Sequence, residues 1–333
     1  MGRQDLLDAN GLSAPRPLSP TKGACTMKAA IIREYETDIE IDEVGEPALQ
    51  DDSVLISVHA ASLNPIDYIL QSGVMKDSIS LQFPHVMGFD VSGVITCVGS
   101  KVSGFKVGDA VFARANQDDA GAIAEVARLK ADEMALKPEN ISHVEAASVP
   151  LAGLTAWQAL VTRGNLKQGE KVLIHAGSGG VGTLAIQIAK HIGAHIATTC
   201  SPRNADLVRS LGADVVIDYN TQAFEDELAD YDMVFDMLGG ETLNRSFKVL
   251  KKGGRLVSIK GQDTDNLAEK HGVRFEWFFM EPDGEMLGQL AALIKNGTIR
   301  TIIDSTYGMA ETAEAYGALK EGHAVGKIVV IVA

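Results

Sequence analysis

The stretch HAGSGGVG, residues 175–182, constrains the fold of this chain more than any other feature of its sequence. It places Gly177, Gly179 and Gly182 in a G-x-G-x-x-G pattern, after an apolar strand-like segment and at the start of a helix expected over 181–192. In this setting the first glycine permits a tight turn and the second lets the backbone approach a pyrophosphate. The third lets the helix pack closely on the strand. The pattern therefore predicts a dinucleotide-binding β-α-β unit.

The glycine loop and the first turn of its helix are expected to hold the phosphates. Backbone N–H groups are free at a helix N-terminus, and the helix dipole favours negative charge there. We expect these contacts from six successive residues: Gly177, Ser178, Gly179, Gly180, Val181 and Gly182. A merely structural glycine-rich turn is the alternative, which the strand-loop-helix context disfavours.

The segment TTCSPRNAD, residues 198–206, indicates which nucleotide binds. In such units an acidic residue about 20 positions after the glycines bonds the ribose of NAD, whereas an Arg accommodates the 2′-phosphate of NADP. That position falls near Ser201 here, and no carboxylate follows before Asp206. Ser201 and Arg203 suit a phosphate, and Tyr219 ends the next strand. We expect NADPH rather than NADH; a solvated Arg203 is the alternative.

The order of the segments predicts two domains. From 153 to 283, strands alternate with helices, which is typical of a doubly wound parallel sheet with right-handed crossovers. Residues 27–152 contain short Val- and Gly-rich strands and are expected to form a mostly-β, barrel-like domain. The last helix within 153–283 is expected over 241–254. Residues 284–333 contain short strands, expected over 298–303 and 327–332, that resemble those of residues 27–152 and are expected to complete that mostly-β domain. Residues 1–26 are expected to be a disordered extension or a tag.

Composition limits the partners of the chain. A net charge of −14 argues against nucleic acid, which requires a basic surface. The three cysteines form no CxxC pair, which argues against a disulfide framework or a cysteine-rich zinc site. No apolar run reaches the roughly 20 residues that span a bilayer. We therefore expect a cytoplasmic protein with a small-molecule partner, no nucleic acid and no membrane.

Six motifs together resemble one enzyme superfamily. They are SLNPIDY (62–68), GFDVSG (88–93), GFKVGDAV (104–111), LAGLTAWQAL (151–160), HAGSGGVG (175–182) and VGKIVV (325–330). The chain resembles the medium-chain dehydrogenase/reductases, and within them the zinc-free NADPH:quinone oxidoreductase-like branch of the zeta-crystallin and enone reductase type. The resemblance implies an α/β fold with a Rossmann domain, a GroES-like barrel domain and a possible homodimer.

The resemblance also implies chemistry without a metal. Zinc alcohol dehydrogenases of the superfamily have a Cys ligand where Asn64 stands, and a His-Glu pair where Phe89 and Asp90 stand. Phe89 has no lone pair to give, and an Asn amide is a poor zinc ligand. Without a Lewis acid an alcohol is not readily converted to an alkoxide, so reversible alcohol oxidation is not expected.

Hydride transfer to a quinone or an α,β-unsaturated carbonyl needs less assistance. It requires a hydrogen-bond donor near the oxygen that becomes negative, while the cofactor carries the difficult chemistry. The resemblance implies that Asn64 lies beside the nicotinamide and substrate. Tyr68 is a candidate donor or proton source, and solvent protonation is equally consistent. A turn at Asn64 and simple packing of Tyr68 are the structural alternatives.

The remaining candidate residues are further cofactor contacts and the walls of the substrate cleft. The resemblance implies that Thr155 and Lys327 reach the cofactor, with a helix cap and a solvated strand-edge lysine as the respective alternatives. Leu238 and Gly239 are also expected to contact the cofactor, because they follow a sheet strand and ligands meet the carboxyl ends of such strands. The substrate cleft is expected to be walled by Phe89, Phe278 and Phe279, with core packing as the alternative for the last two. His175, just before the glycine loop, is expected to be a buried, hydrogen-bonded residue.

Three functions are compared on this basis. The leading one is an NADPH-dependent reductase of quinones or enones. A 2-enoyl-thioester reductase would use the same conjugate addition, but no basic cluster for a carrier or nucleotide stands near 62–90. A non-catalytic NADPH-binding sensor or interaction protein on the same fold is the alternative from a different class, because fold alone does not establish catalysis.

Overall fold

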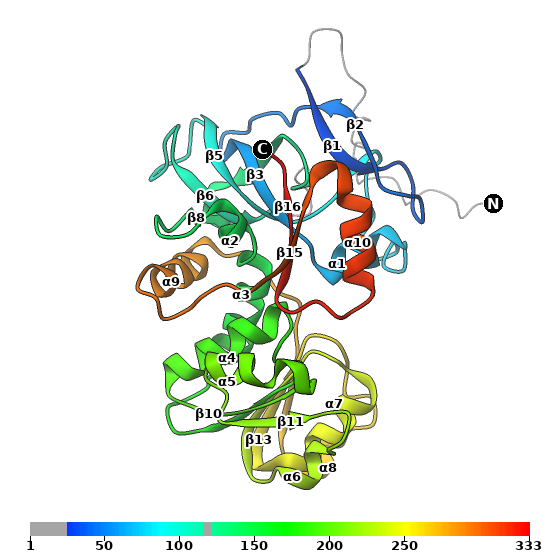
Figure 1. Cartoon of the computed structure of the whole chain (residues 1–333), viewed down its shortest axis with the longest axis vertical. Helices are drawn as coiled ribbons and strands as arrows, with labels where there is room; N and C mark the ends of the chain where they lie inside the picture. Colours follow the sequence, from blue (N-terminus) through cyan, green and yellow to red (C-terminus); the bar gives the residue numbers. More distant parts are fainter. Residues whose placement is uncertain (1–24, 116–120) are drawn as a thin grey trace, which may run out of the picture.

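The computed structural model describes residues 25–115 and 121–333, in which two large sheets organise two lobes (Figure 1). The lower lobe contains a six-stranded parallel sheet in the order β11-β10-β9-β12-β13-β14. Its strands are β9 (Lys171–Ile174), β10 (His195–Cys200), β11 (Val215–Asp218), β12 (Tyr231–Asp236), β13 (Leu250–Ser258) and β14 (Arg274–Trp277). The order reverses between β9 and β12, and ligands of open α/β sheets bind at such a switch point.

Helices cover both faces of this sheet. One face is covered by α4 (Gly180–Ile192) and α5 (Ala205–Leu211), and the other by α6 (Phe224–Glu227), α7 (Gly240–Ser246) and α8 (Leu267–His271). The apolar cluster under α4 continues into α3 (Pro150–Trp157) and α9 (Gly284–Lys295), which pack on each other and on the upper lobe. Successive residues of β9 point to opposite faces, so Val172 joins the first core and Leu173 the second. Burial on both faces explains why these strands are almost continuously apolar.

The upper lobe is mostly β. Its seven-stranded sheet runs β15-β16-β3-β5-β6-β8, with β7 paired to β3. These strands are β3 (Ser53–Ser62), β5 (Asp90–Val98), β6 (Ala110–Arg114), β7 (Val126–Lys130), β8 (Met134–Leu136), β15 (Ile303–Gly308) and β16 (Lys327–Ile331). Because β16 pairs antiparallel with β3, the C-terminal segment returns to complete the lobe, as the sequence predicts.

Smaller elements surround this sheet. A second sheet joins β2 (Glu40–Gly45), β1 (Thr26–Ile32) and β4 (His85–Val86), and the helices are α1 (Pro65–Gln71), α2 (His143–Ala147) and α10 (Thr312–Lys320). Short 3₁₀ turns lie at Ala131–Glu133, Pro202–Asn204, Phe247–Val249 and Met309–Glu311, and a π-helical segment at Gln158–Arg163. The parallel sheet and the mostly-β lobe together confirm the predicted α/β fold class.

Several predicted boundaries differ from the structure. The helix expected over 241–254 ends as α7 at Ser246, and Lys251–Gly254 belong to β13, where Gly253 N–H donates to Gly272 O. The strand expected over 298–303 begins only at Ile303, because Ile299 N–H donates back to Leu293 O at the end of α9. In the first place a hydrogen bond to a distant residue overrides the local pattern, and in the second the hydrogen-bonded end of α9 does.

The predicted domain limits at 152/153 and 283/284 stay predictions, which the two sheets support. All six strands of the parallel sheet fall within 153–283. Of the predicted N-terminal extension, residues 1–24 lie outside the described residues, whereas Thr26 already begins β1 opposite Gly45.

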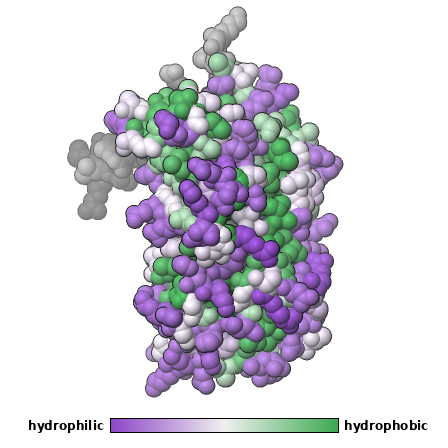
Figure 2. Space-filling view, turned by 60° about the vertical axis from the view of Figure 1, so that its left-hand side comes forward, coloured by the Kyte–Doolittle hydropathy of each residue, from purple (hydrophilic) through white to green (hydrophobic). Residues whose placement is uncertain are grey.

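Figure 2 shows a mostly hydrophilic face with a band of hydrophobic residues along one side. Among the described residues no helix is both long and apolar enough to cross a membrane.

His175 ties the parallel sheet to helix α7. Its Nε2 lies 2.8 Å from Ser246 Oγ, and its Nδ1 lies 3.3 Å from Thr199 Oγ1. Ser246 Oγ donates its own proton to Thr242 O, so we assign the imidazole proton to Nε2, which then donates to Ser246. Burial lowers the pKa of His175 to about 3. The prediction of a buried, hydrogen-bonded histidine is confirmed.

The depressed pKa of His175 predicts acid sensitivity. A histidine with a folded pKa of about 3 and an unfolded pKa of about 6.5 adds stability above pH 6.5. That stability is lost as the pH falls toward about 3. Between pH 7 and pH 4, urea titrations should show the wild type losing about 3 kcal/mol more than His175→Gln. Equal losses in both proteins would contradict the assignment.

Gly182 permits the close packing of α4 on β9. A Cβ at this residue would lie 2.3 Å from Ala176 O and 2.7 Å from Gly177 Cα, both in the backbone. Gly182→Ala should therefore cost about 1–3 kcal/mol of folding stability, measured by urea unfolding. Gly288→Ala on α9 is the matched control, since its Cβ would meet nothing within 4 Å. That variant should be neutral or slightly stabilising; equal effects at the two positions would refute the packing role.

Candidate active site

The glycine loop has the geometry expected of a phosphate-binding turn. A Cβ at Gly177 would lie 2.0 Å from Thr198 Oγ1, so this glycine allows the close turn over the sheet. A Cβ at Gly179 would meet only Ala176 O, at 3.4 Å, which leaves the space beside it open. Helix α4 begins at Gly180 with Gly179 as its N-cap, so its first N–H groups face that open space. The loop fits a pyrophosphate.

The loop also contacts the upper lobe. Gly326 N–H donates to Ser178 O at 2.9 Å, and Gly179 and Gly326 form a parallel β-bridge. Ser178 Oγ accepts a hydrogen bond from Asn204 Nδ2 at 3.0 Å. The segment just before β16 therefore holds the glycine loop in place.

The residues predicted to select NADPH lie together at the ends of β10 and β11. Cys200 pairs with Asp218 across these strands, so Ser201 and Tyr219 leave the sheet side by side. Ser201 Oγ is buried and has no hydrogen-bond partner among the described residues, which marks it as a site for a ligand oxygen. Tyr219 is 60% exposed, and the Asp218 carboxylate accepts hydrogen bonds from Asn220 and Thr221 in its own turn. This end of the sheet fits a 2′-phosphate.

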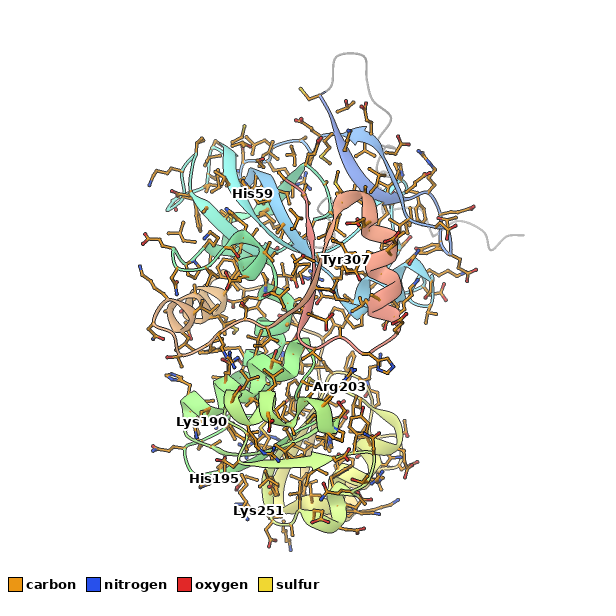
Figure 3. All side chains as sticks on the ribbon, viewed as in Figure 1. His59, Lys190, His195, Arg203, Lys251 and Tyr307 are labelled. Atoms are coloured by element: carbon orange, nitrogen blue, oxygen red, sulfur yellow. The ribbon has the colours of Figure 1, made fainter. Side chains whose placement is uncertain are left out.

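Arg203 completes this group from the 3₁₀ turn after β10. Its Nη2 donates to His323 O at 3.1 Å, so the guanidinium reaches toward the upper lobe, and Figure 3 shows it between the lobes. Its other donors project toward solvent, because Arg203 is an exposed residue. A guanidinium in this place can pair with a phosphate.

A cavity of about 390 Å³ lies between the lobes. Residues predicted for cofactor or substrate that line it are Asn64, Tyr68, Thr155, Gly179, Gly180, Val181, Gly182, Phe278, Phe279 and Lys327. The remaining predicted residues, which lie outside this lining, are Phe89, Gly177, Ser178, Ser201, Arg203, Tyr219, Leu238 and Gly239. The glycine loop and the motif around Asn64, far apart in sequence, thus share one cavity.

Three predicted residues have surroundings that the sequence does not reveal. Thr155 lies inside α3 rather than at its start, and its Oγ1 donates to Leu151 O at 2.7 Å. Leu238 and Gly239 follow β12, and their N–H groups donate to the Asp236 carboxylate at 3.1 Å. Their role in cofactor binding stays a prediction.

The aromatic residues predicted for the substrate cleft divide into two groups. Phe278 is buried and Phe279 is half exposed, and both line the cavity. Phe89 instead belongs to the core of the upper lobe and lies outside the lining. The Arg114 guanidinium stacks over its ring, 4.5 Å from the centroid. Arg114 therefore lies against Phe89 and lines the cavity in place of it.

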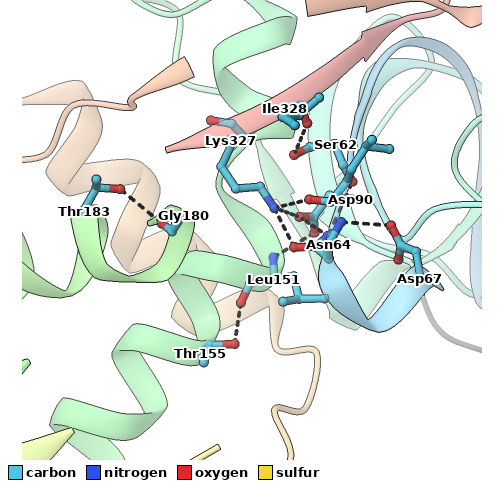
Figure 4. A network of polar contacts seen from close by, with 12 residues as sticks. Ser62, Asn64, Asp67, Asp90, Leu151, Thr155, Gly180, Thr183, Lys327 and Ile328 are labelled. Atoms are coloured by element: carbon cyan, nitrogen blue, oxygen red, sulfur yellow. Dashed lines mark hydrogen bonds and ion pairs between the residues drawn. The ribbon is translucent and has the colours of Figure 1, made fainter. Parts of the chain in front are cut away.

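Asn64 and Lys327 form the centre of a buried polar network (Figure 4). Lys327 Nζ donates to Asn64 Oδ1 at 2.5 Å and to Leu63 O at 2.7 Å, and lies 3.5 Å from Asp90 Oδ2. Asn64 Nδ2 donates to the same Asp90 oxygen at 3.0 Å. Leu151 N–H donates to the other oxygen of Asp90 at 2.8 Å. Every donor of the ammonium group therefore faces an acceptor.

Burial acts on the charges of this network in opposite directions. It raises the pKa of Asp90 and lowers the pKa of Lys327, and the attraction between the two charges opposes both shifts. Each charge of the pair has the opposite charge and hydrogen-bond partners beside it, which offset part of the cost of burial. The network thus presents a rigid Asn64 amide to the cavity.

Asp67 extends the network away from the cavity. Its Oδ2 accepts from Asn64 N–H at 2.9 Å and from Tyr316 Oη at 2.8 Å. Its Oδ1 is buried without a partner among the residues described. Burial raises the pKa of Asp67 to about 7, against the lowering effect of those hydrogen bonds. The carboxyl group closes the first turn of α1 and fixes the backbone of Asn64.

Sequence reasoning missed several of these groups. The sequence marks Asp90 only as a replaced zinc-ligand position and assigns no role to Arg114 or Tyr316. One available signal was a basic residue, Arg114, closing the apolar strand AVFAR. Tyr316 gave no signal, because it reaches Asp67 from 249 residues away along the chain. No group of three or more His, Cys, Asp or Glu residues suited to a metal occurs within 25–115 and 121–333.

Comparison with known proteins agrees with this geometry. Residues 50–139 match the family described as "Alcohol dehydrogenase GroES-like domain", and residues 211–330 match "Zinc-binding dehydrogenase". In this chain, however, Asn64 and Phe89 occupy positions that the resemblance assigns to zinc ligands.

Individual relatives are similar over most of their length. The chain is 38% identical to the NADPH-dependent alkenal/one oxidoreductase, chloroplastic, of Arabidopsis thaliana, over 97% of this chain and 85% of the relative. It is 37% identical to the 2-methylene-furan-3-one reductase of Solanum lycopersicum, over 86% and 74%. The solved structure of the quinone oxidoreductase from Coxiella burnetii superposes with a TM-score of 0.85 at 33% identity, over 93% of this chain and all of that one. The chain therefore belongs to the medium-chain dehydrogenase/reductase superfamily, in its zinc-free quinone oxidoreductase-like branch.

Proposed function

We propose that this chain is an NADPH-dependent oxidoreductase that reduces quinones or α,β-unsaturated carbonyls by hydride transfer without zinc. The observation that carries the proposal is the shared cavity, in which the open side of the glycine loop and the Asn64–Lys327 network face the same space. The names of the relatives support the same activity, since they describe alkenal/one, furanone and quinone reductases.

Bound NADPH supplies the hydride, and the residues of this chain position the two reactants. The glycine loop holds the pyrophosphate, while Ser201, Arg203 and Tyr219 hold the 2′-phosphate. Asn64 is held by its hydrogen bonds to Lys327 and Asp90 and orients the ring and the acceptor. Placing reactants in this way lowers the entropic part of the barrier.

The outer part of the cavity receives the acceptor in this proposal. Phe278 and Phe279 supply an apolar wall, which suits a flat conjugated molecule and excludes water. Tyr68 at the rim is the proposed proton source, with solvent as the alternative. A homodimer and a cytoplasmic location are further proposals, carried over from the resemblance and the composition.

The proposed activity predicts turnover with acceptors of one electronic type. NADPH consumption should accelerate with quinones and with enals or enones, and should not accelerate with saturated aldehydes or ketones. The reason is that hydride addition to a conjugated carbon needs no Lewis acid, whereas the saturated carbonyl lacks that route. The measurement is loss of the reduced-nicotinamide absorbance. Saturable NADPH binding without turnover on any acceptor would instead support the non-catalytic alternative.

The 2′-phosphate site predicts a change in cofactor preference. Arg203→Asp should weaken NADPH binding by about tenfold or more and leave NADH binding almost unchanged, because a carboxylate repels the phosphate that NADH lacks. Fluorescence titration with both nucleotides measures the ratio. Arg209→Asp on α5, whose guanidinium pairs with Asp206 at the surface, is the matched control and should leave the ratio unchanged. An unaltered preference in the first variant would remove Arg203 from the site.

A further inference from the structure

We propose that Arg114 is a catalytic residue that donates hydrogen bonds to the carbonyl oxygen of the acceptor and stabilises the negative charge that forms there. The inference rests on the proposed function, which it deepens by naming the group that replaces a Lewis acid. It is carried by the placement of a buried cation on the wall of the cavity, with one buried donor that has no partner among the described residues.

The position of Arg114 is fixed by the sheet. It is the last residue of β6 and stands opposite Asp90, the first residue of β5. The Cζ atom of its guanidinium lies 4.5 Å from the centroid of the Phe89 ring, a cation–π contact that limits its movement. Although only 5% of Arg114 is exposed, the residue lines the cavity. A guanidinium held beside the cavity in this way is preorganised to donate to a carbonyl oxygen.

One donor of Arg114 has no acceptor among the described residues. Its Nε is buried and makes no hydrogen bond to any of them. Burial lowers the pKa of Arg114, and the charges of Asp90, Glu133 and Asp67 oppose that shift from a distance. A buried donor left unpaired is costly, so such a group indicates a missing partner. The partner would enter from the cavity.

The other polar side chains considered on the cavity wall are either hydrogen-bonded to protein groups or exposed to solvent. Lys327 bonds Leu63, Asn64 and Asp90, and the Thr155 hydroxyl bonds Leu151. The Asn64 amide nitrogen donates to Asp90. Lys260 is exposed, and Tyr68 is partly exposed. Among the described residues of this lining, Arg114 is therefore the buried cation that has an unpaired hydrogen-bond donor.

The reaction explains what these donors would do. A hydride from the reduced nicotinamide brings two electrons and forms a C–H bond at the β-carbon of the enone. The C=C π pair shifts to the adjacent position and the C=O π pair moves onto oxygen, which becomes an enolate oxygen. That oxygen accepts the Arg114 hydrogen bonds until the α-carbon takes a proton from Tyr68 or solvent. A donor preorganised for such an oxyanion acts mainly on kcat.

Kinetics of Arg114 variants test the role. Arg114→Met should lower kcat by about 10²-fold with an enone and with a quinone, with little change in the NADPH dissociation constant. Arg114→Lys should recover part of the lost kcat, because lysine keeps the positive charge but lacks the planar, paired N–H donors of the guanidinium. Free guanidinium should partly rescue Arg114→Ala. Arg209→Met, at an exposed surface arginine, is the control for removing a guanidinium and should keep wild-type kcat.

A binding measurement tests the same group without turnover. 4-Nitrophenol bound with NADP⁺ mimics the enolate oxygen, and its absorbance distinguishes phenol from phenolate. The apparent pKa of the bound phenol should be about 1–2 units higher in Arg114→Met than in the wild type, because a nearby cation favours the phenolate. Melting temperatures of the variants identify any that fail to fold, in which case Arg114→Lys carries the test.

The outcomes separate the two levels of the proposal. A wild type that reduces no quinone or enone would refute the proposed function itself. A wild type that turns over beside an Arg114→Met protein with kcat within about twofold and an unshifted phenol pKa would refute only the role of Arg114. A loss confined to KM, and only for acceptors with a carboxylate, would also overturn it, since Arg114 would then bind a substrate anion rather than the developing charge.

Discussion

The buried ammonium of Lys327 is the interaction on which the site depends. It comes from the first residue of β16 and reaches the end of β3 and the start of α1, where it bonds Leu63 O and Asn64 Oδ1. An ammonium removed from water must be paired, and Asp90 provides the opposite charge. Removing either Lys327 or Asp90 alone would leave the other charge buried and uncompensated, which costs several kcal/mol. The position of Asn64 is therefore determined by the C-terminal strand.

This network occupies the place that the superfamily resemblance gives to a catalytic zinc. In the zinc enzymes a metal would polarise the oxygen of the substrate. Here the same part of the fold holds an amide, a carboxylate and an ammonium that neutralise one another. This network therefore supplies a rigid frame and no Lewis acid, so the reaction requires an acceptor that is itself electrophilic. A conjugated carbonyl or a quinone has that character; a simple ketone has less.

The sequence allowed the fold and the nucleotide loop to be predicted because their signals are local. Gly177, Gly179 and Gly182 stand between one strand and one helix, and both elements form where expected. The boundary of β15 could not be read, because Gln187 on α4 bonds both the N–H and the carbonyl of Arg300 and keeps that residue out of the strand. Arg114 and Tyr316 could not be identified for a similar reason, since each acquires its role only through contacts between distant segments.

The hydrogen bond between Gly326 and the glycine loop has a consequence for motion. Gly326 N–H donates to Ser178 O in a bridge between the lobes, next to where the pyrophosphate would lie. The lobes cannot open at this point without breaking a backbone hydrogen bond, so any hinge must pivot around it. An acceptor would then enter past partly exposed lining residues such as Tyr68 and Phe279, while the contacts to the nucleotide stay unchanged through the cycle.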